Sequence, residues 1–303
     1  MSTPLISPVA RSPFAGIVLC LIAAMSFACN TALASVAYHH GATPLSVLTY
    51  RIALAVIALF VVLKILKVPV RLPPRQRNTA LALGVILGAY SYGLLGAVSY
   101  MPVALAVLTF YLYPLFVGLA SWALGREKMT FALGGALVVA FIGLSLALDL
   151  GGGTLNAVGF AHALGGAILI TVLVLLNARM VGSGDSRPVS LHMLFTGFLS
   201  YLACDIVLGT YPLPVDTTGW IAFLCVGIFY SFSIVAMFVA ISWIGTVRTA
   251  LIMNLEPITS VFLGTVILGQ PMSATQLLGA AIVVGAIVFT AWHKLRPQRM
   301  APV

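Results

Sequence analysis

The sequence predicts an all-helical membrane protein of ten transmembrane helices, arranged as two inverted repeats of five helices each. Three observations predict this fold class: an extremely apolar composition, ten apolar stretches of membrane-spanning length, and an ordered internal repeat. Hydrophobic residues make up 61% of the 303 positions and charged residues 7%, with a mean hydropathy of +1.14. Soluble domains carry roughly 25% charged residues, so this chain has too few charges to cover a water-soluble surface.

Ten apolar stretches are long enough to cross a bilayer. A spanning helix needs about 20 apolar residues, because every backbone polar group must be satisfied within the segment. Turn-forming residues and charges separate the stretches, as at 71–74 and 211–214, and the connections are too short to hold a soluble domain. The predicted spans are 14–37, 45–66, 79–100, 103–124, 130–149, 156–179, 189–210, 218–241, 246–268 and 273–294.

The formal net charge of +9 indicates membrane topology and not nucleic-acid binding, because no basic patch is interleaved with stacking aromatics. The basic residues lie in short connections and at the chain ends. If the N-terminus is cytoplasmic, every Lys and Arg except Arg51 lies on the cytoplasmic side, as the positive-inside rule requires. Both termini are then cytoplasmic, and we expect a multi-pass protein of the cell (inner) membrane.

The two halves of the chain, 1–150 and 151–303, resemble each other in sequence. The segments 99–114 (SYMPVALAVLTFYLYP) and 242–257 (SWIGTVRTALIMNLEP) align without a gap. Each copy contains five predicted spans, an odd number, so the second copy enters the membrane from the opposite side. The loop charges agree with this inversion, because the charged segment 126–128 (REK) corresponds to the uncharged segment 270–272 (QPM).

The paired segments 113–127 (YPLFVGLASWALGRE) and 255–270 (LEPITSVFLGTVILGQ) resemble the drug/metabolite transporter superfamily, specifically its ten-helix EamA-type branch. The resemblance covers nearly the full chain. It implies an exporter of amino acids and related metabolites, with a central cavity between the repeats that is lined by helices other than the fifth and tenth. The amino-acid exporters of the branch are the closest analogy. Two departures, Gln270-Pro271 and Tyr113-Pro114, argue against a mechanism that needs a carboxylate in both halves.

Several polar and aromatic residues fall near the centres of the predicted spans and would converge if the repeats face each other. They would form aromatic walls with hydroxyl tips and one ionisable group, suited to an apolar or amphipathic solute. Alternatively, each tyrosine packs between helices with its hydroxyl bonded to a neighbour, and Asn30 bonds an adjacent helix instead of a substrate carboxylate. The candidate substrate-cavity residues are Asn30, Tyr90, Tyr92, Tyr111, Tyr113, Tyr230 and Glu256.

Glu256 is the most informative of these residues, because an uncompensated charge at the bilayer centre costs about 3 kcal/mol. It is either a protonatable group coupled to transport, a receptor for a substrate ammonium, or a structural acceptor held protonated or hydrogen-bonded beside Pro257. The prolines Pro114 and Pro257 occupy matching positions and predict symmetric kinks with a gating role. Membrane helices also tolerate prolines that have no such role.

Three further features have mainly structural interpretations. Arg51, the only cation away from the predicted cytoplasmic face, is interpreted as an anchor that snorkels outward or pairs with Asp149 or Asp205. His162 is interpreted as a packing histidine. Gly84 and Gly88 form a face of small residues that allows close helix approach.

The sequence therefore predicts a secondary transporter of a small molecule, an amino acid or related metabolite, that works in the lipid bilayer without a cofactor or metal, with proton coupling left open. The alternatives are a drug or phosphorylated-metabolite transporter of the same superfamily, and a channel. Phosphate recognition favours buried Arg or Lys, and only Arg51 and Arg248 come close. An enzyme is disfavoured, because there is no paired His/Asp motif within a span and no Gly-rich phosphate loop.

Overall fold

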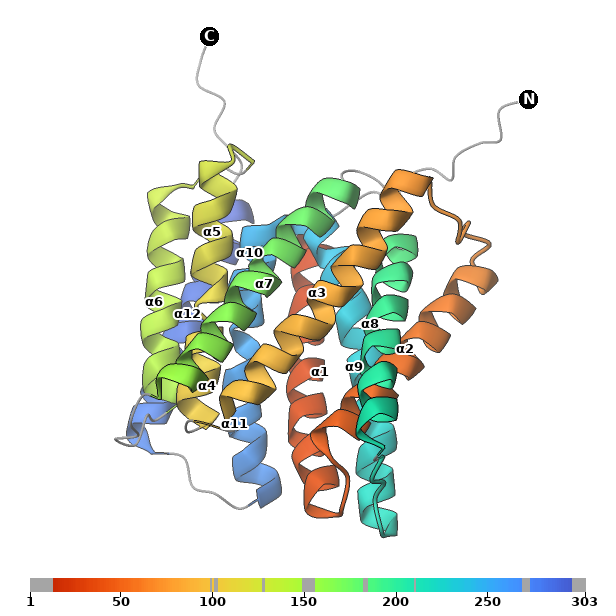
Figure 1. Ribbon diagram of the computed structural model, residues 1–303. Helices are drawn as coiled ribbons and strands as arrows, with labels where there is room; N and C mark the ends of the chain where they lie inside the picture. The colour runs from red at the N-terminus through yellow and green to blue at the C-terminus, as the bar shows by residue number, and fades with distance from the viewer. Residues whose placement is uncertain are drawn as a thin grey trace, which may run out of the picture.

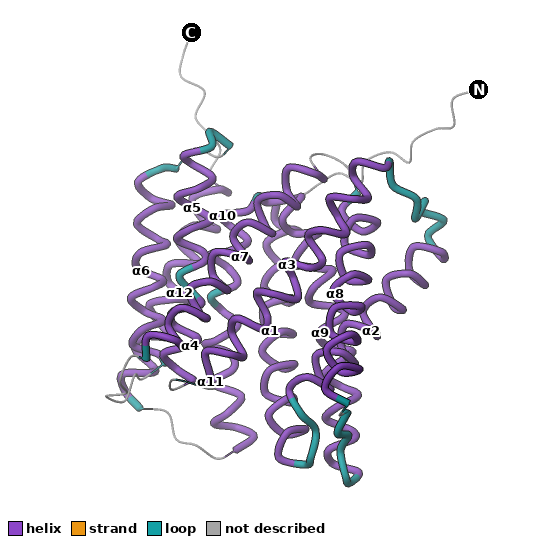
Figure 2. Tube along the Cα trace, in the orientation of Figure 1, coloured by secondary structure: helices purple, strands orange, loops and turns teal. Residues whose placement is uncertain are grey.

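The computed structural model describes residues 13–98, 100, 103–126, 129–148, 156–181, 185–209, 211–268 and 273–295, and their regular secondary structure is entirely helical (Figures 1 and 2). The helices form two series that match in order and in relative length. The first series is α1 (Pro13–His39), α2 (Pro44–Ile65), α3 (Pro74–Val98), α4 (Val103–Phe110), α5 (Tyr113–Ala123) and α6 (Phe131–Ala147). The second series is α7 (Ala157–Val181), α8 (Ser186–Leu208), α9 (Thr217–Ile244), α10 (Thr246–Met253), α11 (Leu255–Leu268) and α12 (Ala274–Leu295).

Six described helical segments are long and apolar enough to cross a membrane: α1, α2, α7, α8, α9 and the segment Leu105–Ala123, which includes most of α4 and all of α5. Two shorter apolar helices, α6 and the Ala274–Thr290 part of α12, accompany them. The composition and the helix lengths therefore support a multi-pass membrane protein. The expected total of ten spans remains a prediction.

Two of the predicted spans, 103–124 and 246–268, are interrupted helices and not continuous ones. The first divides into α4 and α5 and the second into α10 and α11, so the prediction of a single helix at each place is corrected. The physical reason is the matching pair of prolines just inside α5 and α11, Pro114 and Pro257, because proline lacks an amide hydrogen and its ring clashes with the preceding turn.

The second interruption is stabilised by a side chain. Asn254 lies between α10 and α11, and its side-chain amide donates hydrogen bonds to the carbonyls of Ala250 at 3.2 Å and Leu251 at 3.0 Å. Carbonyls at the end of a helix lack partners within the helix, and a nearby side-chain donor removes this deficit inside an apolar environment. The Asn254 side chain therefore lets the helix end within the bundle.

The contacts between the two halves follow an approximate twofold pattern. Helix α1 packs on α9 while its counterpart α7 packs on α3, and α2 packs on α9 while its counterpart α8 packs on α3. The helix α2 also packs on its own counterpart α8, and α6 on α12. Figure 1 shows α3 and α7 lying alongside each other across the molecule, and α6 and α12 at one edge of the bundle. The bundle interior is thus built from both halves.

Glycines allow the closest approaches between helices of different halves. A Cβ atom on Gly84 of α3 would overlap the carbonyl of Met193 in α8, and one on Gly93 would lie 2.8 Å from the carbonyl of His162 in α7. On the other side of the bundle, a Cβ on Gly143 of α6 would lie 2.9 Å from the carbonyl of Gly279 in α12. The hydrophobic effect does not drive helices together in lipid, so helix association there depends on close packing. Small residues at these contacts allow that close packing.

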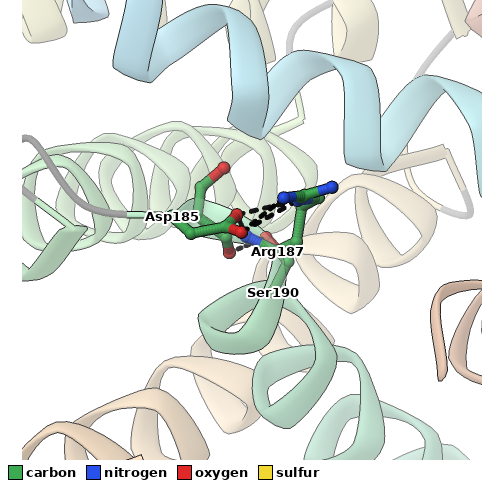
Figure 3. A network of polar contacts seen from close by, with 4 residues as sticks. Asp185, Arg187 and Ser190 are labelled. Carbon is green, nitrogen blue, oxygen red and sulfur yellow. Dashed lines mark hydrogen bonds and ion pairs between the residues drawn. The ribbon is translucent and has the colours of Figure 1, made fainter. Parts of the chain in front are cut away.

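The two ends of the bundle differ in charge. The α2–α3 connection with Lys67 and Arg71 lies at the same end as the start of α8, where Arg187 lies beside Asp185 (Figure 1). Figure 3 shows this pair: Asp185 caps α8 by accepting from the Arg187 amide at 3.0 Å, and the Arg187 guanidinium binds its carboxylate at 2.6 Å. The α1–α2 and α8–α9 connections, with His40 and Asp216, lie at the opposite end.

Candidate functional site

A polar and aromatic group of side chains lies in the interior where the two halves meet. We call it the central cluster; its members come from α1, α2, α3 and the α4–α5 break in the first half and from α9 and α11 in the second half. The central cluster consists of Asn30, Arg51, Tyr90, Phe110, Tyr111, Tyr113, Tyr230 and Glu256.

Arg51 is held on two sides by other members of the cluster. Its guanidinium carbon lies 4.3 Å from the centre of the Tyr230 ring, which is a cation–π distance. With the Asn30 amide oriented so that its oxygen faces the guanidinium, that oxygen accepts a hydrogen bond from Arg51 Nη1 at 3.3 Å and another from the Thr31 amide at 3.2 Å. The Nε of Arg51 is buried and has no hydrogen-bond partner. Arg51 is therefore positioned with at least one donor unused.

Glu256 enters the same region from the second half and contacts aromatic residues of the first half. Its carboxylate forms a side-chain hydrogen bond with the hydroxyl of Tyr111. The Tyr111 ring centre lies 5.7 Å from that of Tyr113 and 5.9 Å from that of Phe110, and Phe110 stacks at 6.0 Å on Tyr90. The rings of Tyr90, Phe110, Tyr111 and Tyr113, from α3 and the α4–α5 region, thus form an aromatic wall that Glu256 contacts through Tyr111.

The two opposite charges of the cluster lie within each other's field without forming a direct ion pair. Arg51 acts electrostatically on Glu256, and both act on Tyr90. In the part of the chain that the structure describes, the ion pairs within 4.0 Å are His40–Asp216 and Arg187–Asp185, both at the ends of the bundle. The cluster therefore presents a separated positive and negative group.

Some members of the cluster retain accessible surface deep inside the bundle. Tyr111, Tyr113, Tyr230 and Asn30 are buried, whereas Arg51, Tyr90 and Glu256 are only partly buried. The two charged side chains of the cluster, Arg51 and Glu256, therefore keep part of their surface accessible.

Tyr92 is the one expected cavity residue that lies apart from the cluster. Its side chain is 66% exposed on the outside of the bundle, where its ring lies 6.4 Å from that of His162. The physical reason is helix geometry: each residue is rotated by about 100° about the helix axis from the one before it, so the side chains of residues i and i+2 face nearly opposite directions. Tyr90 and Tyr92 therefore cannot both point inward.

Arg51 lies in the central cluster, although the sequence analysis did not include it among the cavity candidates. It does not pair with Asp205, whose carboxylate instead accepts a hydrogen bond from the Thr49 hydroxyl at 2.6 Å, and Asp149 lies outside the described residues. The available signal was its isolation as the only cation away from the basic ends, which marks a functional candidate in a membrane helix.

Tyr201 of α8 was also missed. It is buried beside Tyr90, and its hydroxyl donates to the Gly88 carbonyl at 3.2 Å and bonds Ser91. His162, by contrast, lies outside the cluster: its ring stacks on Tyr100 at 5.7 Å, and its Nδ1 bonds the Val158 carbonyl at 2.8 Å. This placement fits the packing interpretation of His162.

At the end of the bundle away from the basic connections, the two halves are joined by loop contacts. His40 Nδ1 lies 2.6 Å from Asp216 Oδ2, and the amide of Val215 donates to the His40 carbonyl at 3.0 Å. The pKa of Asp216 is held below its usual value by the hydrogen bond from the Gly219 amide and by His40. These contacts tie the α1–α2 connection to the α8–α9 connection.

An apolar helical bundle with two matching halves, interrupted helices and ionisable groups where the halves meet is typical of membrane transporters. The model of the EamA-like transporter family matches residues 14–148 and, a second time, residues 157–292. The chain belongs to this family, within the drug/metabolite transporter superfamily, and contains two EamA repeats.

A relative and a solved structure agree with this membership. The chain is 25% identical over 308 aligned positions to a protein of Bacillus subtilis (strain 168) described as the uncharacterized transporter YcbK, covering 94% of this chain and 96% of that protein. A crystal structure of another protein superposes with a TM-score of 0.74 at 22% identity, covering 92% of this chain and 98% of the other. That likeness shows the fold alone.

Proposed function

We propose that the protein is a secondary transporter that exports small metabolites, specifically amino acids with aromatic or other apolar side chains, across the cell (inner) membrane. The observation that carries this proposal is the central cluster, which brings Arg51 and Glu256 together with a wall of aromatic rings. A zwitterionic head group next to an apolar side chain matches a site with separated opposite charges and an aromatic surface.

Alternating access follows from the arrangement of the halves. The twofold contact pattern lets the two repeats rock against each other about the central cluster, with inverted copies exchanging roles at the two faces. The helix breaks at Pro114 and Pro257 lie beside Tyr113 and Glu256, so bending there would move cluster residues directly. We assign the gating role to these two breaks.

Glu256 is the candidate for proton coupling. It is the carboxylate of the central cluster, and its hydrogen bond from Tyr111 can be kept whether the group is ionised or protonated. A proton or the ammonium group of a substrate can neutralise the Glu256 carboxylate in turn. Exchange of the bound proton for the bound ammonium would couple export of the substrate to entry of a proton. This role is distinct from the structural one, in which Glu256 only anchors α11 to Tyr111.

The test is transport by the purified full-length chain in liposomes. Vesicles loaded with unlabelled amino acid should accumulate external radiolabelled L-phenylalanine by counterflow, above the level of protein-free vesicles. A panel of apolar and polar amino acids, sugar phosphates and cationic drugs sets the specificity. Uptake confined to phosphorylated solutes or drugs would show that the protein transports those solutes and not amino acids. Single-channel conductance in a planar bilayer would show that it is a channel.

A further inference from the structure

We propose that Arg51 recognises the carboxylate of the transported solute and that Arg51 and Glu256 together select zwitterions. This inference rests on the proposed function and specifies its substrate class. It assigns to Arg51 a binding role in place of the structural anchor expected from the sequence.

The first argument is the incomplete hydrogen bonding of Arg51. An arginine within the membrane region is costly unless it is paired, and its planar group offers five donors that match a carboxylate in a two-point geometry. The structure gives it one neutral acceptor, Asn30, and one ring face, Tyr230, while Nε is buried without a partner. A buried unused donor on a cation is most readily satisfied by an anionic acceptor.

The second argument is that the surrounding residues orient Arg51 instead of neutralising it. Tyr230 covers one face of the guanidinium, and Asn30, which is itself fixed by the Thr31 amide, holds Nη1. Asp205 accepts a hydrogen bond from Thr49 through Oδ2 at 2.6 Å, and its Oδ1 is buried without a partner, so it does not pair with Arg51. A structural ion pair would bring a carboxylate onto the guanidinium, whereas a binding site keeps the guanidinium fixed and available.

The third argument is the charge balance of the cluster. The central cluster contains one guanidinium and one carboxylate that form no direct ion pair, and it therefore matches a solute with one carboxylate and one ammonium. A phosphate dianion in the central cluster would meet one cation, Arg51, and would be repelled by Glu256. The other candidate cation, Arg248, is not a member of the cluster: it lies in the first turn of α10, where its Nη1 donates to the Ile244 carbonyl at 3.5 Å. The geometry therefore favours a zwitterion over a phosphorylated solute.

The test compares three related probes on the full-length protein in detergent by titration calorimetry. L-phenylalanine has both charges, L-phenylalaninamide lacks the carboxylate, and 3-phenylpropionate lacks the ammonium. The wild type should bind L-phenylalanine about 10- to 100-fold more tightly than L-phenylalaninamide, as expected for charge-assisted hydrogen bonds. In Arg51→Gln the ratio of the two affinities should fall to about one. The affinity for L-phenylalanine drops, while the affinity for L-phenylalaninamide does not depend on the guanidinium and stays the same. Arg51→Lys should restore part of the preference.

The complementary variant is Glu256→Gln, which should lose the preference for L-phenylalanine over 3-phenylpropionate but keep the preference over L-phenylalaninamide. Arg187→Gln is the matched control, because it removes a cation at the end of α8 and should leave both preferences unchanged. The ratios of affinities report recognition and are not moved by a purely structural role. Retained binding of L-phenylalaninamide by the Arg51 variants, and of 3-phenylpropionate by Glu256→Gln, shows that each variant is folded.

The outcomes separate the two proposals. If the wild type prefers L-phenylalanine and Arg51→Gln keeps that preference, the inference about Arg51 is wrong while the proposed function stands. If the wild type binds none of the three probes and takes up no amino acid in liposomes, both fail together. If inorganic phosphate or a sugar phosphate binds in an Arg51-dependent manner and L-phenylalanine does not, Arg51 is a phosphate receptor and the zwitterion assignment is overturned.

Discussion

The hydrogen bond between Tyr111 and Glu256 joins the two halves at the level of single side chains. If Glu256 exchanges a proton during transport, Glu256→Gln should lower pH-driven uptake of L-phenylalanine at least tenfold and flatten its pH profile, because a glutamine cannot carry the proton. Counterflow without a pH gradient should be affected less. An unchanged rate and an unchanged pH profile in this variant would remove the coupling role and leave the structural one.

Tyr111→Phe is the control that separates the hydrogen bond from the carboxylate. It keeps the edge contact of the ring with Phe110 and the tilted contact with Tyr113 but removes the hydroxyl. We expect a smaller loss of transport than in Glu256→Gln, with the pH dependence retained. An equal loss in the two variants would show that the hydrogen bond itself, and not proton exchange, is what transport needs.

Tyr230 allows the cation–π contact with Arg51 to be tested by a matched pair. Tyr230→Phe keeps the aromatic face under the guanidinium at 4.3 Å, whereas Tyr230→Leu removes it. A desolvated contact of this kind contributes about 1–2 kcal/mol, so the leucine variant should bind L-phenylalanine about 5- to 30-fold more weakly and the phenylalanine variant nearly as well as the wild type. Calorimetry of both variants checks this, and equal affinities would show that the ring does not position Arg51.

Residue-scale predictions from the sequence depend on knowing which way each side chain faces. Tyr90, Tyr111 and Glu256 were identified by depth in the membrane, and the structure brings them together. Depth alone also selected Tyr92, because two residues on one turn share a depth while facing different directions. The sequence did not include Arg51 among the cavity candidates, because its contacts with Asn30 and Tyr230 depend on how α2 packs against α1 and α9.

At the scale of elements, the contact between α6 and α12 offers a stability test with an internal control. A Cβ on Gly279 would meet the Gly143 carbonyl and the Ala147 backbone, whereas one on Gly285 of the same helix meets no atom within 4 Å. Gly279→Ala should therefore destabilise the protein by about 1–3 kcal/mol. Gly285→Ala should be neutral or stabilising by up to about 1 kcal/mol, from helix propensity. Melting temperatures in detergent that shift equally in both variants would contradict this packing.

The contact between the α1–α2 and α8–α9 connections should depend on pH. Because the folded-state pKa of Asp216 lies below its usual value, its contribution is present above that usual value and is lost as the pH falls through the lowered pKa. The wild type should melt at a higher temperature than Asp216→Asn at neutral pH, and the difference should vanish in acid. Asparagine still caps α9, so the comparison isolates the charge. A difference that persists at the lowest pH would assign the effect to packing.

Helix existence was easier to predict than helix continuity. The apolar stretches located each helix, because a spanning segment must form its own backbone hydrogen bonds and is therefore recognisable by its length and hydropathy. The breaks between α4 and α5 and between α10 and α11 were expected only as proline kinks. What the sequence pattern did not reveal is that Asn254 satisfies the carbonyls at the second break, which makes a true interruption tolerable inside the bundle.

At the scale of the whole molecule, the sequence repeat and the contact pattern describe the same symmetry. The aligned segments 99–114 and 242–257 fall at equivalent places, each leading through a short helix into a proline-containing one. The repeat could not reveal which helices of the two halves touch, because that depends on small residues such as Gly84 and Gly143, which meet partners distant in sequence. Sequence therefore predicted the symmetry, and packing determined the interior.

The expected inversion of the two repeats makes a definite prediction about which connections lie on which side of the membrane. In a chain whose four cysteines are replaced, single cysteines at Val70, Asp185 and Val215 mark the α2–α3, α7–α8 and α8–α9 connections. Val70 and Asp185 lie near the basic end and should react with a membrane-impermeant maleimide only after permeabilisation, while Val215 should react in intact cells. Each half then crosses the membrane an odd number of times, because equivalent connections of the two halves, such as α2–α3 and α8–α9, face opposite sides. Labelling of Val70 and Asp185 from opposite sides would rule out this threading and, with it, alternating access by exchange of two inverted repeats.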